Sequence, residues 1–112
     1  MAKSLQIASR EEENVRIIDL TGDLTQSEED LAKLILPSDR ALILNFTQVD
    51  YINSAGIAQL IRLVRSVQEN RVTVLAHGVS THYQKIFQMV SLTNYLYLYP
   101  DEKSALAAAG IM

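Results

Sequence analysis

The sequence predicts an α/β fold: a single domain over residues 1–112, with a mixed β-sheet of four or five strands and about four helices in the order ββαβαβαβα. Three observations support this prediction. Strand-like and helix-like patterns alternate from residue 40 onward. The runs 40–46 and 71–76 are nearly all apolar, as in strands covered on both faces. A chain of 112 residues can bury one core but has no material for a second lobe.

The first two predicted strands are residues 5–8 and 14–20, both rich in β-prone side chains. The charged cluster at 10–13 lies between them and is typical of an exposed hairpin-like turn. The Thr-Gly-Asp sequence at 21–23 is predicted to end the second strand.

A helix is predicted from about residue 26 to 36, because its apolar residues fall at helical spacing. Ser27 precedes an acidic first turn, which favours a helix start, and Pro37 ends the helix. The apolar run 40–46 should then form a central strand, and 47–53 is predicted to be a loop.

The remaining segments alternate between helix and strand. Between residues 57 and 67 apolar side chains recur at every third or fourth position, which predicts an amphipathic helix of about four turns. Strand-helix-strand alternation implies parallel pairing through right-handed crossovers. The later predicted elements are a strand at 71–76, a helix at 80–90, a strand at 95–99 and a short helix after Pro100 that ends at Gly110.

Composition and charge exclude several classes of protein. Hydrophobic residues make up 48% and charged residues 21% of the chain, which is typical of a globular protein. The net charge is −3 and the basic residues are scattered, so we expect no nucleic-acid partner. The charge-free stretch 86–100 falls short of the roughly 20 apolar residues of a membrane span, and residues 1–15 do not resemble a signal peptide. We therefore expect a cytoplasmic protein with no membrane partner.

Signals of enzymatic chemistry are scarce. The absence of cysteine excludes thiolate nucleophiles, and the four glycines form neither G-x-G-x-x-G nor a Walker A loop. His77 and His82 have no carboxylate cluster nearby and are interpreted as exposed or turn residues. Tyr95, Tyr97 and Tyr99 are predicted to pack from one face of a strand against a helix. We expect no catalytic residue, cofactor or metal site.

Ser54 stands where the loop after a central strand meets the long amphipathic helix. As a helix N-cap its hydroxyl would accept a backbone N–H bond, worth about 1 kcal/mol. The same position suits a modification site, because the flanking Ala55 and Gly56 leave the hydroxyl reachable. A phosphate there would be favoured by the helix dipole and would add about −1.5 to −2 charges to the surface. The residues alone leave both interpretations open.

Three stretches in this order resemble the STAS domain of sulphate transporters and anti-sigma factor antagonists. They are "LTGDL" at 20–24, "ALILNFTQVDYINSAG" at 41–56 and the segment from 72 to 106, together with the helix that lies between the last two. The resemblance covers nearly the whole chain. Its most specific part is an acidic or amide residue, a serine, a small residue and a glycine at the start of a helix.

The resemblance implies a non-enzymatic protein-binding switch. In stand-alone bacterial members, the unphosphorylated domain binds an anti-sigma factor that is also a serine kinase of the histidine-kinase-like ATPase type. Phosphorylation of the serine that opens the helix breaks the complex, and a serine phosphatase restores it. Ser54 matches that phosphoacceptor. ATP and Mg²⁺ belong to the partner, so no cofactor is expected on this chain.

The sequence departs from the family pattern at two positions. Asn53 replaces the usual aspartate before the phosphoacceptor, and Thr25 stands where the family often has aspartate after the second strand. Both changes remove a carboxylate, which weakens the negative field that a phosphate on Ser54 would meet.

Two functional hypotheses follow. In the first, the chain is an anti-sigma factor antagonist whose partner-binding surface comprises Asp23, Thr25, Asn53, Ser54, Ala55, Gly56 and Ile57. In the second, it is a constitutive STAS scaffold of a transport or sensory complex, and Ser54 only caps a helix. A hydrolase is disfavoured because no base is predicted near Ser54. Self-association is not predictable from the sequence.

Overall fold

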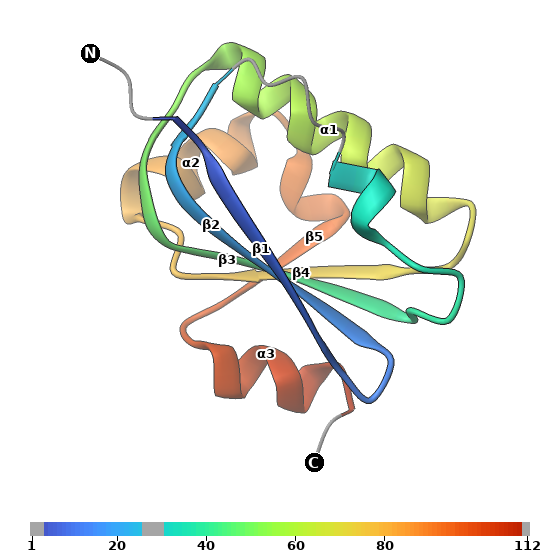
Figure 1. Cartoon of the computed structure of the whole chain (residues 1–112). Coiled ribbons are helices and arrows are strands. Elements are labelled where there is room, and N and C mark those ends of the chain that lie inside the picture. The colour runs from blue at the N-terminus through green and yellow to red at the C-terminus, as the bar shows by residue number, and fades with distance from the viewer. Residues whose placement is uncertain (1–3, 26–30, 111–112) are drawn as a thin grey trace.

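The computed structural model describes residues 4–25 and 31–110, which form one mixed five-stranded sheet with helices on both faces (Figure 1). The strand order is β1-β2-β3-β4-β5, with β1 antiparallel to β2 and the other neighbours parallel. The strands are β1 (Gln6–Glu12), β2 (Val15–Leu24), β3 (Ala41–Ile52), β4 (Thr73–His77) and β5 (Leu96–Tyr99). The helices are α1 (Ser54–Gln68), α2 (Thr81–Met89) and α3 (Glu102–Ala108), with short 3₁₀ turns η1 (Leu31–Leu34) and η2 (Leu92–Asn94).

The predicted mixed α/β fold is confirmed, but the described residues contain three α-helices rather than about four. The difference lies in the predicted helix at 26–36. Its first part, with the proposed cap Ser27, falls outside the described residues, and 31–34 form the 3₁₀ turn η1.

The strands are longer than their apolar runs. The charged residues 10–12 belong to the exposed edge strand β1, and the turn is only Glu13-Asn14, both with positive φ, as two-residue hairpins require. The predictions that β2 ends at 21–23 and that 47–53 form a loop are also wrong, because β2 continues through 21–23 and β3 through 47–52. There β2 and β3 continue side by side through polar residues and end in the buried pair Leu24 and Ile52, so the pairing carries both strands beyond their apolar runs.

Helices α1 and α2 cover one face of the sheet and α3 covers part of the other (Figure 1). Neighbouring residues of one strand therefore enter different cores. Ile18 packs in the α1 core and Ile17 in the α3 core. This two-sided burial explains why the central strands read as continuous apolar runs.

Among the C-terminal tyrosines, the packing prediction holds for Tyr99 alone, which packs against the α3 core. Tyr97 also lies on β5, but it is 49% exposed. Tyr95 precedes the strand and is exposed to the same extent, so it does not share the predicted strand face.

A polar network lies beside the start of α3. Arg10 on β1 donates to both carboxylate oxygens of Asp19, at 2.7 and 2.9 Å, and to Glu102 Oε1 at 2.6 Å. The two bonds from Arg10 lower the pKa of Asp19, and Asn45 also donates to this carboxylate at 2.8 Å. His77 is buried next to this network, contrary to the prediction of an exposed histidine, and its Nε2 lies 3.9 Å from Glu102 Oε1. Burial lowers the pKa of His77, and neither ring nitrogen has a hydrogen-bond partner among the described residues.

Candidate functional site

Ser54 is the first residue of α1 and its side chain is exposed. The helix begins there because Asn53 is extended (φ −101°, ψ −177°) and its Oδ1 accepts from the backbone N–H of Gly56 at 2.9 Å. The N-cap is therefore Asn53, and the prediction that Ser54 caps the helix is wrong. Asparagine is as good an N-cap as serine, so residue preference alone did not distinguish the two neighbours.

The Ser54 segment is held against the end of β2. The backbone N–H of Asn53 donates to the carbonyl oxygen of Leu24 at 3.3 Å. Gly56 lies so close to this strand end that a Cβ there would overlap the same carbonyl. The absence of a side chain at Gly56 thus allows the first turn of α1 to pack directly on the backbone of β2.

On its other side the segment is tied to α2. The backbone N–H of Ile52 donates to the hydroxyl oxygen of Tyr83 at 2.9 Å. Tyr83 belongs to the predicted apolar stripe of its helix, so the sequence shows no signal for this use of its hydroxyl. Tyr51, half exposed in the strand just before the site, is a second surface residue that the sequence reasoning missed.

The structure brings the seven predicted site residues together at the ends of β2 and β3 and the start of α1. They differ in exposure. Ser54 is exposed, whereas Thr25, Asn53 and Ala55 are half-buried. Asp23, Gly56 and Ile57 are buried, so they lie beneath the surface of the site and support its exposed residues.

The site offers a hydroxyl at a helix N-terminus. The first turn of α1 contains no acidic residue, so the partial positive charge of the helix end is not neutralised by a carboxylate of that turn. A phosphate on Ser54 would meet this charge and backbone N–H groups. Among the residues that the structure describes, no cluster of three or more His, Cys, Asp or Glu could hold a metal ion.

A family model for the STAS domain matches residues 6–105. The chain belongs to the STAS domain family. This match includes both strand ends and the helix start that form the site around Ser54. No curated protein sequence matches the chain.

Solved structures share the fold of this STAS domain. An anti-sigma factor antagonist from Mycobacterium paratuberculosis is 21% identical with a TM-score of 0.74, and the match covers 94% of this chain and 93% of that one. A sulfate transporter family protein from Wolinella succinogenes is 19% identical with a TM-score of 0.77, covering 88% and 86%. The anti-sigma factor antagonist SpoIIAA of Bacillus, in its unphosphorylated form, is 15% identical with a TM-score of 0.71, covering 97% and 100%. SpoIIAA also has a structure in its phosphorylated form.

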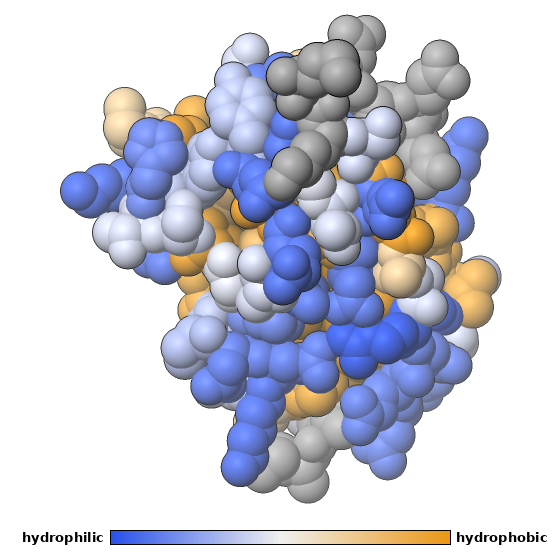
Figure 2. Space-filling view, turned by 60° about the vertical axis from the view of Figure 1, so that its left-hand side comes forward, coloured by the Kyte–Doolittle hydropathy of each residue, from blue (hydrophilic) through white to orange (hydrophobic). Residues whose placement is uncertain are grey.

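The surface of the STAS domain is largely polar on the face shown in Figure 2, where hydrophobic side chains form small, separate patches. In the part of the chain that the structure describes, no helix is both long and apolar enough to span a membrane. The large apolar side chains exposed on the described residues are Leu36, Tyr51, Met89, Val90, Tyr95 and Tyr97.

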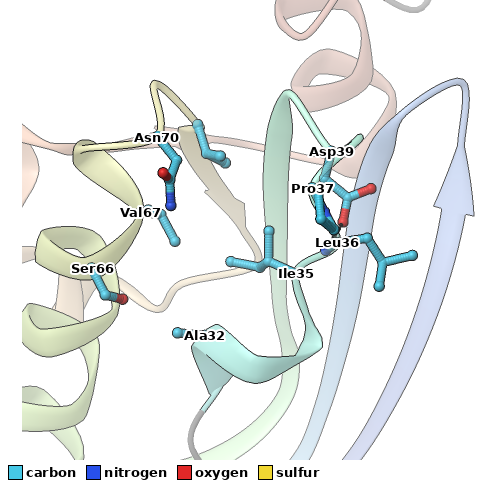
Figure 3. A pocket seen from close by; sticks show the side chains of 9 residues that line it. Ala32, Ile35, Leu36, Pro37, Asp39, Ser66, Val67 and Asn70 are labelled. Carbon is cyan, nitrogen blue, oxygen red and sulfur yellow. Dashed lines mark hydrogen bonds between the residues drawn. The ribbon is translucent and has the colours of Figure 1, made fainter.

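A separate hollow of about 480 Å³ lies near the C-terminal end of α1, at the opposite end of that helix from Ser54 (Figure 3). One wall is fixed by Asp39, whose buried carboxylate accepts from Arg16 at 3.0 Å and from the Leu36 N–H at 2.8 Å. The lining residues are Ala32, Ile35, Leu36, Pro37, Asp39, Ser66, Val67, Asn70 and Val72. A helix of this length puts the hollow roughly 20 Å from Ser54.

Proposed function

We propose that this STAS domain is a cytoplasmic anti-sigma factor antagonist controlled by phosphorylation of Ser54. The unphosphorylated domain binds an anti-sigma factor that is a serine kinase of the histidine-kinase-like ATPase type, and a serine phosphatase reverses the modification. The domain itself is not an enzyme, and ATP and Mg²⁺ are supplied by the kinase. The observation that carries this proposal is the exposed Ser54 hydroxyl at the first position of a helix whose cap is a different residue.

The separation of cap and acceptor allows a switch without refolding. Because Asn53 makes the cap bond, a phosphoester on Ser54 leaves that bond to Gly56 in place. The added charge lies at the positive end of the helix dipole, which stabilises it. The dianion therefore changes the docking surface and leaves the helix start intact.

The presence of Asn53 in place of the family's usual aspartate changes the electrostatics beside the phosphoacceptor. An aspartate in its place could make the same cap bond to Gly56 but would carry a negative charge beside the phosphoacceptor. The neutral amide caps the helix without this repulsion. We infer that the phosphorylated form of this domain is less strained electrostatically than that of a family member with aspartate at this position.

The partner-binding surface is centred on Ser54. Thr25, Asn53 and Ala55 surround it as half-buried neighbours, and Tyr51 adds an aromatic side chain that is 50% exposed. Aromatic side chains are common binding hot spots, and a dianion next to one disfavours an apolar or acidic partner surface.

The alternative is a constitutive scaffold in a transport or sensory complex. The similarity of the fold to that of a sulfate transporter family protein supports this alternative. In that case the charge on Ser54 has no regulatory role, so phosphomimetic variants should bind the partner as well as the wild type does.

Binding measurements on Ser54 variants test the two functions. We would titrate the histidine-kinase-like ATPases of the same cell against the wild type, Ser54→Ala and Ser54→Asp, and record the circular dichroism of each variant. The switch predicts that Ser54→Ala binds and resists release, whereas Ser54→Asp keeps its spectrum and loses the partner. Ser38→Asp, which adds the same charge to an exposed turn residue before β3, is the control and should bind normally. Equal binding by Ser54→Asp and the wild type would favour the scaffold.

A further inference from the structure

The end of β3 extends beyond its neighbour β4. The two strands pair only as far as Asn45 and His77, and the chain then turns away at Gly78, which has a φ of +77°. A Cβ at this glycine would overlap the backbone of Thr47, so the turn lies tightly against β3. β3 continues past this point to Ile52, where β4 no longer runs beside it.

Tyr83 takes the place of the missing strand at Ile52. Successive backbone N–H groups of a strand point to opposite sides, and the Asn53 N–H is directed to Leu24 of β2. The preceding N–H, that of Ile52, points away from β2 and donates to the Tyr83 hydroxyl oxygen. A side chain of α2 therefore satisfies a backbone donor that a sheet neighbour would otherwise pair.

The helix that carries Tyr83 is itself firmly anchored. The Ser80 hydroxyl accepts from the Tyr83 N–H at 3.3 Å and caps α2, and Gln84 donates from its side chain to the carbonyl of Val79 at 2.9 Å. Phe87, fully buried on the same helix, packs edge-to-face on Phe46 with 6.0 Å between ring centres. The Tyr83 hydroxyl is therefore carried by a helix whose position is fixed by its cap and by core packing.

We propose that Tyr83 is a positioning residue for Ser54. Its hydroxyl holds residues 52–54 from the α2 side, while Leu24 holds them from the β2 side, and together they set the direction in which the Ser54 hydroxyl is presented. The consequence for phosphate transfer rests on the proposed function. Loss of the Tyr83 hydroxyl leaves the docking surface in place but lets the acceptor move, so it lowers the rate of transfer more than it weakens binding.

Amide hydrogen exchange followed by NMR tests the positioning without any partner. In Tyr83→Phe, which removes only the hydroxyl, the amide of Ile52 should exchange roughly five- to tenfold faster, the effect of losing one hydrogen bond. The amides of β4 should change less than the amide of Ile52, and the urea midpoint should fall only slightly, as expected for the loss of a single hydrogen bond. Tyr97→Phe is the matched control, because it removes a hydroxyl from a half-exposed tyrosine on β5 and should change neither measurement. Unchanged exchange at Ile52 in Tyr83→Phe would overturn the proposal.

Phosphorylation kinetics test the consequence for Ser54. With a histidine-kinase-like ATPase of the same cell, ATP and Mg²⁺, Tyr83→Phe should lower kcat severalfold with KM nearly unchanged, and Tyr97→Phe should match the wild type. A wild-type domain that no such kinase phosphorylates would refute the proposed function, while the exchange result would still decide whether Tyr83 holds the segment. Normal kcat in Tyr83→Phe, with a wild type that is phosphorylated, would refute the positioning role.

Discussion

Replacement of Asn53 by alanine should destabilise the domain, because it removes the cap bond to Gly56 at the start of α1. Loss of an N-cap costs about 1 kcal/mol. For a chain of 112 residues, an unfolding entropy of about 2.1 cal/mol/K per residue converts this into a fall in Tm of about 4 °C. Asn53→Asp should stay within about 0.5 kcal/mol of the wild type, since aspartate caps as well as asparagine.

Ser54→Ala is the informative comparison for Asn53→Ala. Ser54 is exposed and is not the cap, so its replacement should change stability by no more than about 0.5 kcal/mol. Urea and thermal unfolding of the variants, followed by far-UV circular dichroism, provide the measurement. If Ser54→Ala cost as much as Asn53→Ala, the hydroxyl would be part of the helix cap, and the separation of cap and phosphoacceptor would be refuted.

Three further predictions concern stability. Burial holds the pKa of His77 below its ordinary value of about 6.5, so the free energy of unfolding should be highest above that pH and fall as the pH drops below it. His77→Gln should flatten this decline in urea titrations from neutral to acidic pH. An equally steep decline in the variant would contradict the assignment of this effect to His77. Gly56→Ala should cost about 1–3 kcal/mol in chemical unfolding, since the overlap with the Leu24 carbonyl outweighs the gain in helix propensity; a stabilised variant would show that the close approach is absent. Arg16→Met should lower the free energy of unfolding by about 3–5 kcal/mol, because it leaves the buried carboxylate of Asp39 without a cation. The double variant Arg16→Met with Asp39→Leu should recover part of this loss, because Asp39→Leu removes the unpaired charge but also the acceptor of the Leu36 N–H. No recovery would argue against an ion-pair origin.

The fold was predictable because the central strands and α1 have strong hydrophobic patterns. Burial on both faces makes the runs in β3 and β4 almost wholly apolar, and the period of α1 is regular. Strand ends were less predictable. The ends of β2 and β3 pair with each other and return to the core at Leu24 and Ile52, but the polar residues that precede these two resemble a loop in the sequence. The exposed residues of β1 likewise resemble a turn because an edge strand needs no apolar pattern.

The location of the candidate site was predictable, but its internal contacts were not. A strand end followed by Asn53-Ser54 and a glycine indicated a helix start, and the structure places one there. Which of the two residues caps the helix depends on a single backbone conformation, since both residue types favour that role. The contact between Tyr83 and Ile52 joins residues distant in sequence and follows from where β4 ends, which no local pattern specifies.

Intact-mass measurement of the protein purified from its native cell, with and without phosphatase treatment, tests the central claim most directly. A switch controlled at Ser54 predicts a fraction of molecules heavier by one phosphoryl group, which fragmentation assigns to Ser54 and phosphatase removes. A single unmodified mass under every growth condition, or a phosphoryl group on another residue, would contradict it.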